Sequence, residues 1–335
     1  MRILITGATG QVGRFLVNAL LNDDNFKNSS FRLLFRDISK IPEDIDLDRF
    51  ELFQGDLKEM SCEDYNLLVD GVDAVVHLAA IFNMYQPYDE EMKETNVDAT
   101  AKLLDCFIRG NGQVFIHCSS IVAYGFNGSP LKTEETPLSA SYGYGKSKQE
   151  SDKIAMKYQE MARMEGNGKN IVILRPAAIM SPEDKIALPL VKKFVKSRMK
   201  LKPSMTFPLV HVKDVVNVIM KVLLEKDVKN ETYNVCSYQP GINELGEILA
   251  TEFSDRGYKK PLIPVPVWII GLMKPLIKMG FKLKKPGPDS FIPPLFLEAI
   301  GELGEDYHVS TEKIERDLDF HPVYKDIREA IKNCI

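Results

Sequence analysis

The chain has 335 residues, a composition ordinary for a globular protein and a formal net charge of −4. This length allows one large domain or two closely joined ones, and the negative charge argues against a nucleic-acid-binding surface. The five cysteines show no close pairing and the five histidines are scattered, which indicates a reducing compartment and gives no metal-ligand pattern. Because the N-terminus enters a predicted strand directly, we expect no signal peptide and a cytoplasmic protein.

The first half of the sequence alternates short apolar runs with amphipathic ones. Strands are predicted at residues 2–6, 31–35, 50–54, 73–80, 114–119 and 170–175. Helices are predicted at residues 12–21, 88–108 and 144–162. Strand–helix alternation of this kind predicts an α/β fold, a doubly wound parallel sheet with helices on both faces.

A glycine-rich run, Thr-Gly-Ala-Thr-Gly-Gln-Val-Gly at residues 6–13, follows the first predicted strand and opens the first predicted helix. Glycines there permit a tight turn and a close approach of the backbone to a pyrophosphate. The helix N-terminus adds free N–H groups and a positive field. We therefore predict a dinucleotide site that uses Gly7, Thr9, Gly10, Gln11, Val12 and Gly13.

The end of the second predicted strand should meet the adenosine ribose of such a cofactor. Arg36 occupies the place where an acid would bind a free 2′-hydroxyl, and a guanidinium suits a 2′-phosphate, with Arg14 as a second cation. We therefore predict NADP in preference to NAD, although a small shift in register would present Asp37 instead. Asp56 and Leu57, after the third strand, are predicted to meet the adenine.

Two Tyr-x-x-x-Lys frames overlap, Tyr142 with Lys146 and Tyr144 with Lys148. On a helix, the Tyr144 frame continues along a small and apolar stripe, and the Tyr142 frame continues along a charged one. We therefore place Tyr144 and Lys148 inside the protein and Tyr142 at the surface or the rim of a site. An ammonium ~4 Å from a phenol favours its ionised form by ~4 kcal/mol at an effective dielectric of about 20, so the pair indicates proton transfer.

The pattern changes after Pro176, where residues 177–208 are rich in proline and lysine. The elements predicted beyond them are a helix at 213–224, a strand at 232–235 and a helix at 244–253 capped by Asn243. We predict a nucleotide-binding domain formed by residues 1–176 and 209–235. Residues 177–208 and 236–335 are expected to form a smaller, mostly helical substrate-binding lobe over the strand ends.

One apolar segment, residues 262–283, raises the question of a membrane. Three prolines and three lysines interrupt it, so a spanning helix is disfavoured. A buried or pocket-lining helical region is the favoured interpretation. Peripheral contact with a membrane through residues 262–285, helped by the lysines at its end, is the alternative.

Eight motifs follow one another along the first 235 residues. They lie at residues 6–13, 55–57, 77–80, 95–100, 119–125, 144–148, 174–176 and 210–215. In this order they resemble the extended short-chain dehydrogenases/reductases, the group also called NAD-dependent epimerase/dehydratases. The resemblance implies a Rossmann domain and a homodimer formed through the helices at 88–108 and 144–162.

The resemblance also implies roles for individual residues. Ser120 would be the catalytic serine and Tyr144 the general acid/base. Lys148 would bind the nicotinamide ribose and lower the pKa of Tyr144, and Asn96 would support the active-site helix. The residues implied to line the cofactor are Ala79, Ala80 and Pro176.

Three sequence features choose among the reactions of such enzymes. Ile121 and Val122 follow Ser120 where sugar dehydratases of the family usually carry Asp-Glu, so elimination is disfavoured. Residues 202–209 lack the glycine and arginine with which nucleotide-sugar epimerases hold their substrates. The apolar run at 81–85 is more similar to the dihydroflavonol reductase and 3β-hydroxysteroid dehydrogenase branch. The residues predicted to line the substrate are Phe82, Met84, Tyr85 and Tyr142.

We therefore predict hydride transfer between nicotinamide C4 and a ketone, aldehyde or secondary alcohol of a small, apolar substrate. A nucleotide-sugar epimerase remains an alternative, since the core motifs are shared and the lysine cluster at 192–202 could bind a phosphate, although a solvated helix face is favoured for that cluster. A non-catalytic NADP-binding sensor or assembly factor is a further alternative. It is disfavoured because both Tyr144 and Lys148 are present.

Overall fold

The structure of the chain is a computed structural model. It describes residues 1–37, 49–83, 85–125, 129–182, 184, 189, 199–200, 206–225, 228–252, 263–264 and 307–334. Met84, nearly all of the apolar segment 262–285 and nearly all of the lysine cluster 192–202 lie outside these residues. The predictions made for them stay predictions.

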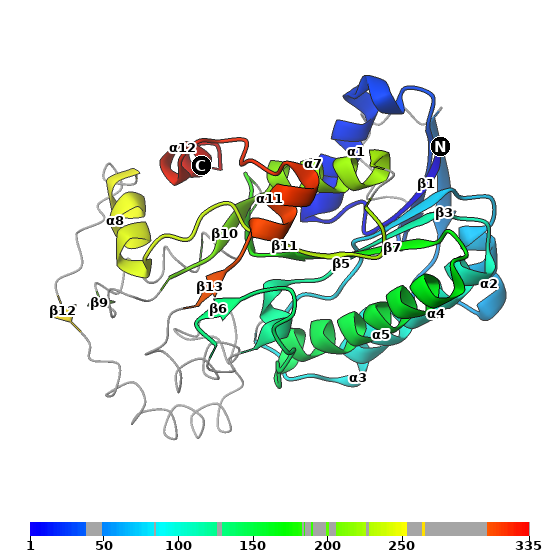
Figure 1. Ribbon diagram of the computed structural model, residues 1–335, viewed down its shortest axis with the longest axis horizontal. Coiled ribbons are helices and arrows are strands. Elements are labelled where there is room, and N and C mark those ends of the chain that lie inside the picture. The colour runs from blue at the N-terminus through cyan, green and yellow to red at the C-terminus, as the bar shows by residue number, and fades with distance from the viewer. Residues whose placement is uncertain are drawn as a thin grey trace.

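A seven-stranded sheet, parallel throughout, forms the centre of the fold (Figure 1). Its spatial order is β11-β7-β5-β4-β1-β2-β3. The strands are β1 Arg2–Thr6, β2 Ser30–Phe35, β3 Phe50–Gln54, β4 Ala74–His77, β5 Val114–Cys118, β7 Asn170–Pro176 and β11 Thr232–Val235. The central strands are apolar on both faces because helices cover both sides of the sheet.

Two layers of helices enclose this sheet. The helices α1 Gln11–Asn22, α7 Val212–Leu224 and α11 Glu312–Leu318 contribute buried residues to the core on one face. The helices α2 Cys62–Val69, α4 Ala99–Arg109 and α5 Gly143–Glu165 pack against the other face (Figure 1). The predicted fold class, a doubly wound α/β sheet, is confirmed.

Short elements connect these layers. Among them are the 3₁₀ turns η1 Asp24–Phe26 and η5 Ile121–Tyr124, helix α3 Glu90–Lys93 and the π-helical segment η4 Glu94–Asp98. Three two-stranded parallel pairs also form, β8 Ala178–Met180 with β10 Leu209–His211, β9 Met199–Lys200 with β12 Ile263–Pro264, and β6 Leu131–Lys132 with β13 His308–Val309. The last pair joins the C-terminal part of the chain to the segment that follows η5.

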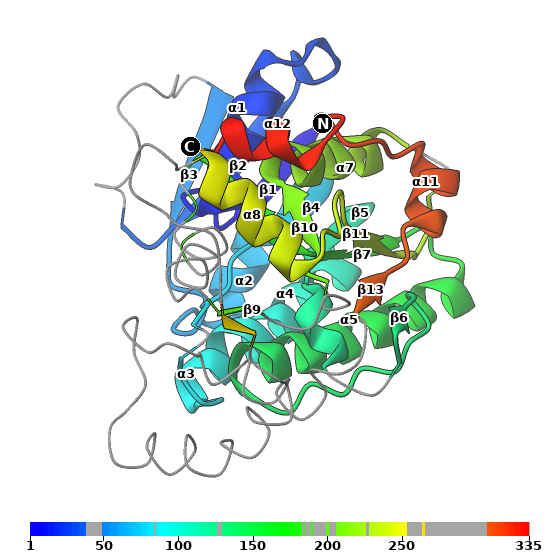
Figure 2. The ribbon, with the colours of Figure 1, turned by 90° about the vertical axis from the view of Figure 1, so that its left-hand side faces the viewer.

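Helices α8 Ile242–Glu252 and α12 Ile327–Lys332 lie near each other beyond the carboxyl end of the sheet, as Figures 1 and 2 show. Leu245 and Ile248 of α8 share a small apolar cluster with Ile331 of α12 and Leu209 of β10. None of the helices among the described residues combines the length and the apolar character needed to cross a bilayer.

Three details differ from the sequence predictions. The helix predicted at 88–108 is divided by η4, where the hydrogen-bonding pattern widens. Asn243 is not the N-cap of α8, because that helix already begins at Ile242. Helix α2 was not predicted, although Ser61 and Asp64 form a reciprocal capping box that marks its start.

Candidate active site

The glycine-rich turn between β1 and α1 is held by backbone contacts. Gly10 N donates to Gly7 O at 2.9 Å, and Gly7 has a φ of +73°, a conformation that side chains disfavour. A Cβ on Gly13 would lie 2.2 Å from Gly7 O, and a Cβ on Gly7 would lie 2.7 Å from Ala79 N. The turn therefore accepts only glycine at both places.

The first backbone amides of α1 lie next to this turn and receive no hydrogen bond from an N-cap side chain. Gly10 is the N-cap and brings no side chain to the first amides of the helix, and Thr9 and Gly10 are exposed. An anion can therefore approach helix N–H groups at a place where the helix dipole is positive. This cradle fits the pyrophosphate of a dinucleotide. The side chain of Gln11 donates to Ser181 Oγ at 2.8 Å and so ties the cradle to the chain after β8.

A buried histidine joins the ends of β1 and β4. The Nδ1 atom of His77 lies 2.7 Å from Thr6 Oγ1, and its Nε2 atom lies 2.9 Å from Thr100 Oγ1. Thr6 Oγ1 also accepts from Ala79 N at 3.3 Å. Burial holds the pKa of His77 well below its usual range, with nearby His117 and Lys148 adding to the effect. The imidazole is therefore neutral near pH 7 and links the ends of β1 and β4 by hydrogen bonds.

The residues predicted to meet the adenosine lie at the ends of β2 and β3. Arg36 and Asp37 are exposed directly after β2. Gly55 N donates to Phe35 O at 2.9 Å, which keeps the two strand ends together. Asp56 is half-buried and its carboxylate accepts from Lys58 N at 3.2 Å.

Helix α5 has the phase predicted for it. Lys148, Ser151 and Ala155 are buried, whereas Lys153 and Lys157 are exposed. Tyr144 is half-buried in the first turn, and Tyr142 is half-buried at the N-cap. The structure thus agrees with the placing of Tyr144 and Lys148 on the inner face of the helix.

A backbone carbonyl holds the ammonium group of Lys148. Its Nζ donates to Cys118 O at 2.7 Å and lies 5.7 Å from the centroid of the Tyr144 ring. Burial raises the pKa of Tyr144, with Cys118 and Asp152 adding to the effect. Burial also lowers the pKa of Lys148. The pKa of Tyr144 is therefore raised where a lowered one was expected, because loss of hydration dominates.

Ser120 lies where the chain leaves β5 and enters η5. Its side chain is half-buried, with Oγ 3.5 Å from Pro176 O and 3.4 Å from Val122 N, both long for hydrogen bonds. Turn η5 packs along α5, the helix that carries Tyr144 and Lys148. The three residues predicted to be catalytic therefore belong to two elements in direct contact.

Asn96 supports this helix, as predicted. Its side-chain amide donates to Ile81 O and to Ser147 Oγ, both at 2.9 Å, and its Oδ1 accepts from Ile81 N at 2.7 Å. Ser147 Oγ in turn donates to Tyr144 O at 2.8 Å. Asn96 lies inside the π-helical segment η4, and such widened turns are frequent at functional sites.

An aromatic side chain covers one side of Tyr144. Phe82 packs edge-on against it, with ring centroids 4.6 Å apart and an interplanar angle of 65°. Phe82 keeps 40% of its surface exposed, which is unusual for phenylalanine. Tyr85 is half-buried in the same segment. Phe82 therefore lies beside Tyr144, and its contact with a substrate stays a prediction.

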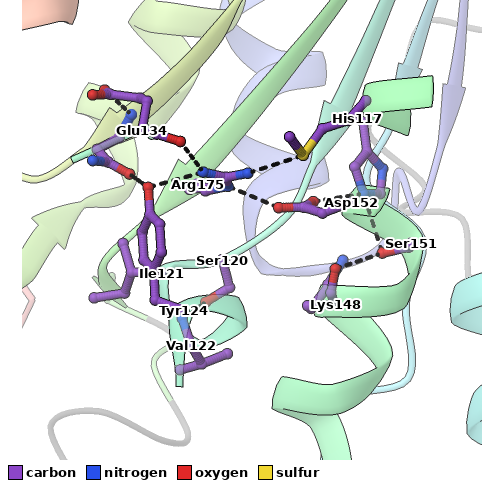
Figure 3. Close-up of polar contacts among 12 residues, drawn as sticks. His117, Ser120, Ile121, Val122, Tyr124, Glu134, Lys148, Ser151, Asp152 and Arg175 are labelled. Atoms are coloured by element: carbon purple, nitrogen blue, oxygen red, sulfur yellow. Dashed lines mark hydrogen bonds and ion pairs between the residues drawn. The ribbon is translucent and has the colours of Figure 1, made fainter. Parts of the chain in front are cut away.

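A buried polar network beside the site was not predicted. Arg175 lies at its centre and reaches Asp152 on α5 and Tyr124 on η5 (Figure 3). Tyr307, from the C-terminal part of the chain, donates to Ile121 O at 2.9 Å. Sequence reasoning noted Arg175 within a motif but gave it no function. The described residues contain no group of three or more histidine, cysteine or acidic side chains arranged to hold a metal ion.

Comparison with known families matches residues 3–236 to the NAD dependent epimerase/dehydratase family. The chain belongs to this family. The resemblance predicted from the eight motifs is therefore confirmed.

Named relatives differ in the reactions that their names describe. Sterol demethylase protein B of Methylococcus capsulatus is 27% identical, over 85% of this chain and 85% of its own length. An uncharacterized UDP-glucose epimerase of Bacillus subtilis, YtcB, is 27% identical, over 70% of this chain and 76% of its own length. The 3 beta-hydroxysteroid dehydrogenase/Delta 5→4-isomerase of Monkeypox virus is 26% identical, over 54% of this chain and 53% of its own length.

Solved structures share the fold over the whole chain. The UDP-glucuronic acid 4-epimerase from Bacillus cereus, in complex with UDP-glucuronic acid and NAD, aligns with a TM-score of 0.73 at 19% identity. The alignment covers 99% of this chain and 97% of that one. An identity this low establishes a common fold and no shared substrate.

Proposed function

We propose that this protein is an NADP-dependent oxidoreductase acting on a ketone, aldehyde or secondary alcohol of a small, apolar substrate. The observation that carries the proposal is the placement of Tyr144 and Lys148 on the inner face of α5, against the turn that begins at Ser120. The glycine cradle between β1 and α1 supplies a place for a dinucleotide beside the same sheet edge. A bound nicotinamide supplies or accepts the hydride.

Residues of the chain carry out the proton transfer. In carbonyl reduction, the Ser120 hydroxyl donates a hydrogen bond to the substrate oxygen and the Tyr144 hydroxyl donates the proton. Because burial raises the pKa of Tyr144, the phenol is protonated near pH 7 and ready to act as the acid. We expect Lys148, fixed by Cys118 O, to bind the ribose and to stabilise the phenolate that remains.

The preference for NADP rests on Arg36. Its side chain is exposed after the last residue of β2, where a ribose 2′-phosphate would be met. Arg14 is exposed on the first turn of α1 and adds a second cation. The NAD bound in the structural relative keeps NAD as the alternative cofactor.

The proposed substrate class rests on the wall beside Tyr144. The exposed part of Phe82 suits contact with an apolar ring of a substrate, and binding such a ring requires no charged group. Two of the relatives carry names that refer to sterols or steroids, which agrees with such a substrate. A nucleotide-sugar epimerase is the second candidate, supported by the relative named as a UDP-glucose epimerase.

A substrate panel separates the two candidates. Purified protein is assayed with NADPH and NADH against a 3-ketosteroid and a dihydroflavonol, and with NAD against UDP-glucose and UDP-glucuronic acid. We expect NADPH oxidation with an apolar ketone and no conversion of the UDP-sugars. Conversion of a UDP-sugar without net cofactor turnover would replace the proposal by the epimerase. No hydride transfer to any carbonyl would favour a cofactor-binding sensor or assembly factor.

A further inference from the structure

Arg175 is a charged side chain that is almost completely buried, with 1% of its surface exposed. Its Nε donates to Asp152 Oδ2 at 2.8 Å, and Asp152 is fully buried on α5. Burial alone would raise the pKa of Asp152, but the charge of Arg175 together with His117 and Ser119 outweighs it, so the pKa is lowered. The pair is therefore ionised and ties β7 firmly to α5.

The other side of the same guanidinium contacts η5 and the chain beyond it. Nη1 donates to Tyr124 OH at 2.9 Å and to Glu134 O at 3.1 Å. Tyr124 is fully buried, and its hydroxyl donates to Asn234 Oδ1 of β11 at 2.7 Å. The aromatic ring of Tyr124 also lies 4.9 Å from the guanidinium carbon of Arg175.

These contacts join the two elements that carry the candidate catalytic residues. Asp152 lies one helical turn after Lys148 on α5, so the two share a face. Tyr124 is the last residue of the turn that starts directly after Ser120. Figure 3 shows Arg175 between Asp152 on one side and Tyr124 on the other.

We propose that Arg175 is a positioning residue that sets the distance between Ser120 and the Tyr144–Lys148 pair, through Asp152 on one side and Tyr124 on the other. The inference rests on the proposed function for its catalytic consequence, but its geometric content is independent of the substrate. Arg175 suits this task because the guanidinium is planar and presents its donors in a fixed fork. A lysine would keep the charge but could not hold Asp152, Tyr124 and Glu134 O together.

Hydrogen exchange tests the geometric content without any substrate. In Arg175→Lys we expect the amides of Ala123 and Gly125, which bond within η5, to exchange at least ~10-fold faster. The matched control is Arg32→Lys. Arg32 is also buried, and its guanidinium donates to the Glu51 carboxylate and to the carbonyls at the end of α2. Unchanged exchange in η5, or an equal increase in the control, would overturn the proposal.

A milder variant covers the case in which Arg175→Lys does not fold. Tyr124→Phe removes only the hydroxyl between Arg175 and Asn234, and Tyr233→Phe is its control, since that hydroxyl contacts Asp317 on another face. We expect faster exchange in η5 for Tyr124→Phe alone. The same exchange rate in both variants would contradict the role assigned to Arg175.

A double-mutant cycle tests the catalytic consequence, with a 3-ketosteroid and saturating NADPH as the probe. Tyr124→Phe should lower kcat ~10-fold or more in the wild-type background while the Kd for NADPH is unchanged. In a Ser120→Ala background the same substitution should cost less than ~2-fold, because it acts through Ser120. Full additivity would overturn the proposal. If Ser120→Ala itself left kcat unchanged, the proposed function would fail and the exchange result would still decide the geometric claim.

Discussion

The turn between β1 and α1 and the turn between β5 and η5 both follow strands of the same parallel sheet, yet they are held in different ways. Backbone atoms hold the turn between β1 and α1. Gly10 N donates to Gly7 O, and Gly7 O lies so close to Gly13 that no Cβ fits there. Buried side chains hold the second, with Arg175 as the common partner of α5 and η5. In the proposed function, a dinucleotide would meet a surface of amides, and the reacting oxygen would meet side chains fixed by other side chains.

This difference predicts how the two regions respond to substitution. Changes in the glycine turn should act on cofactor binding and on every later step. Changes around η5 and α5 should act on turnover while the cofactor still binds. Measurements of both quantities in the same variant test whether cofactor binding and turnover respond separately.

The largest expected effect is the pH dependence of alcohol oxidation. Oxidation needs the Tyr144 phenolate as the base, and burial raises the pKa of this phenol, so its ionised fraction grows about tenfold for each pH unit below that pKa. Initial rates of oxidation should therefore rise roughly a thousandfold between pH 6 and pH 9, whereas carbonyl reduction, which uses the protonated phenol, should stay flat. The Kd for NADP measured alongside is the control. An oxidation rate that levels off near pH 7 would show that the bound cofactor reverses the effect of burial.

Gly13→Ala should weaken the binding of NADPH by about 100-fold or more, equivalent to ~2.7 kcal/mol. The added Cβ would lie 2.2 Å from Gly7 O, so the turn and its amides must move. Fluorescence titration of NADPH measures the change. Gly166→Ala is the control, since a Cβ at Gly166 meets nothing within 4 Å. Binding within twofold of the wild type would rule out this turn as the phosphate site.

Asn96→Ala should lower the free energy of unfolding by about 3 kcal/mol and kcat by roughly 10-fold. It leaves the backbone groups of Ile81 and the hydroxyl of Ser147 without the partner that joins them. Urea denaturation and steady-state rates measure the two effects. Asn22→Ala removes an exposed side-chain amide and should change neither. A stable variant with normal kcat would show that α5 does not depend on η4.

The smallest expected effect concerns the choice of cofactor. Arg36→Ala should lower the preference for NADPH over NADH by about 10-fold, because one exposed charge contact with a 2′-phosphate is lost. Dissociation constants for both cofactors, in wild type and variant, measure this ratio. Arg109→Ala removes a surface cation far along the chain, paired with Asp105, and serves as the control. An unchanged ratio would show that Arg36 does not meet the ribose.

Most of the region around the glycine-rich turn, which backbone atoms hold in place, was predicted from the sequence. Glycine spacing and strand–helix alternation are local patterns, so β1, α1 and the cradle could be predicted from residues 2–22 alone. The helical phase of α5 was likewise a local signal and placed Tyr144 and Lys148 correctly on its inner face.

The supports of the candidate catalytic side chains could not be predicted in the same way. Arg175 is 23 residues from Asp152 and 51 from Tyr124, and no periodic pattern connects them. The contact of Tyr307 with Ile121 spans 186 residues. The pKa of Tyr144 was predicted in the wrong direction because the sequence shows the neighbouring lysine but not the loss of hydration that raises the pKa of a buried phenol.

Turnover of Tyr144→Phe, measured together with NADPH binding, tests the central claim most directly. The substitution removes one hydroxyl and keeps the ring that packs against Phe82, so the cofactor should bind with unchanged Kd. Hydride transfer from NADPH to a 3-ketosteroid should fall by about 10²-fold or more, because no group remains to protonate the oxygen. Retained turnover would contradict the account, since it would remove Tyr144 from the reaction.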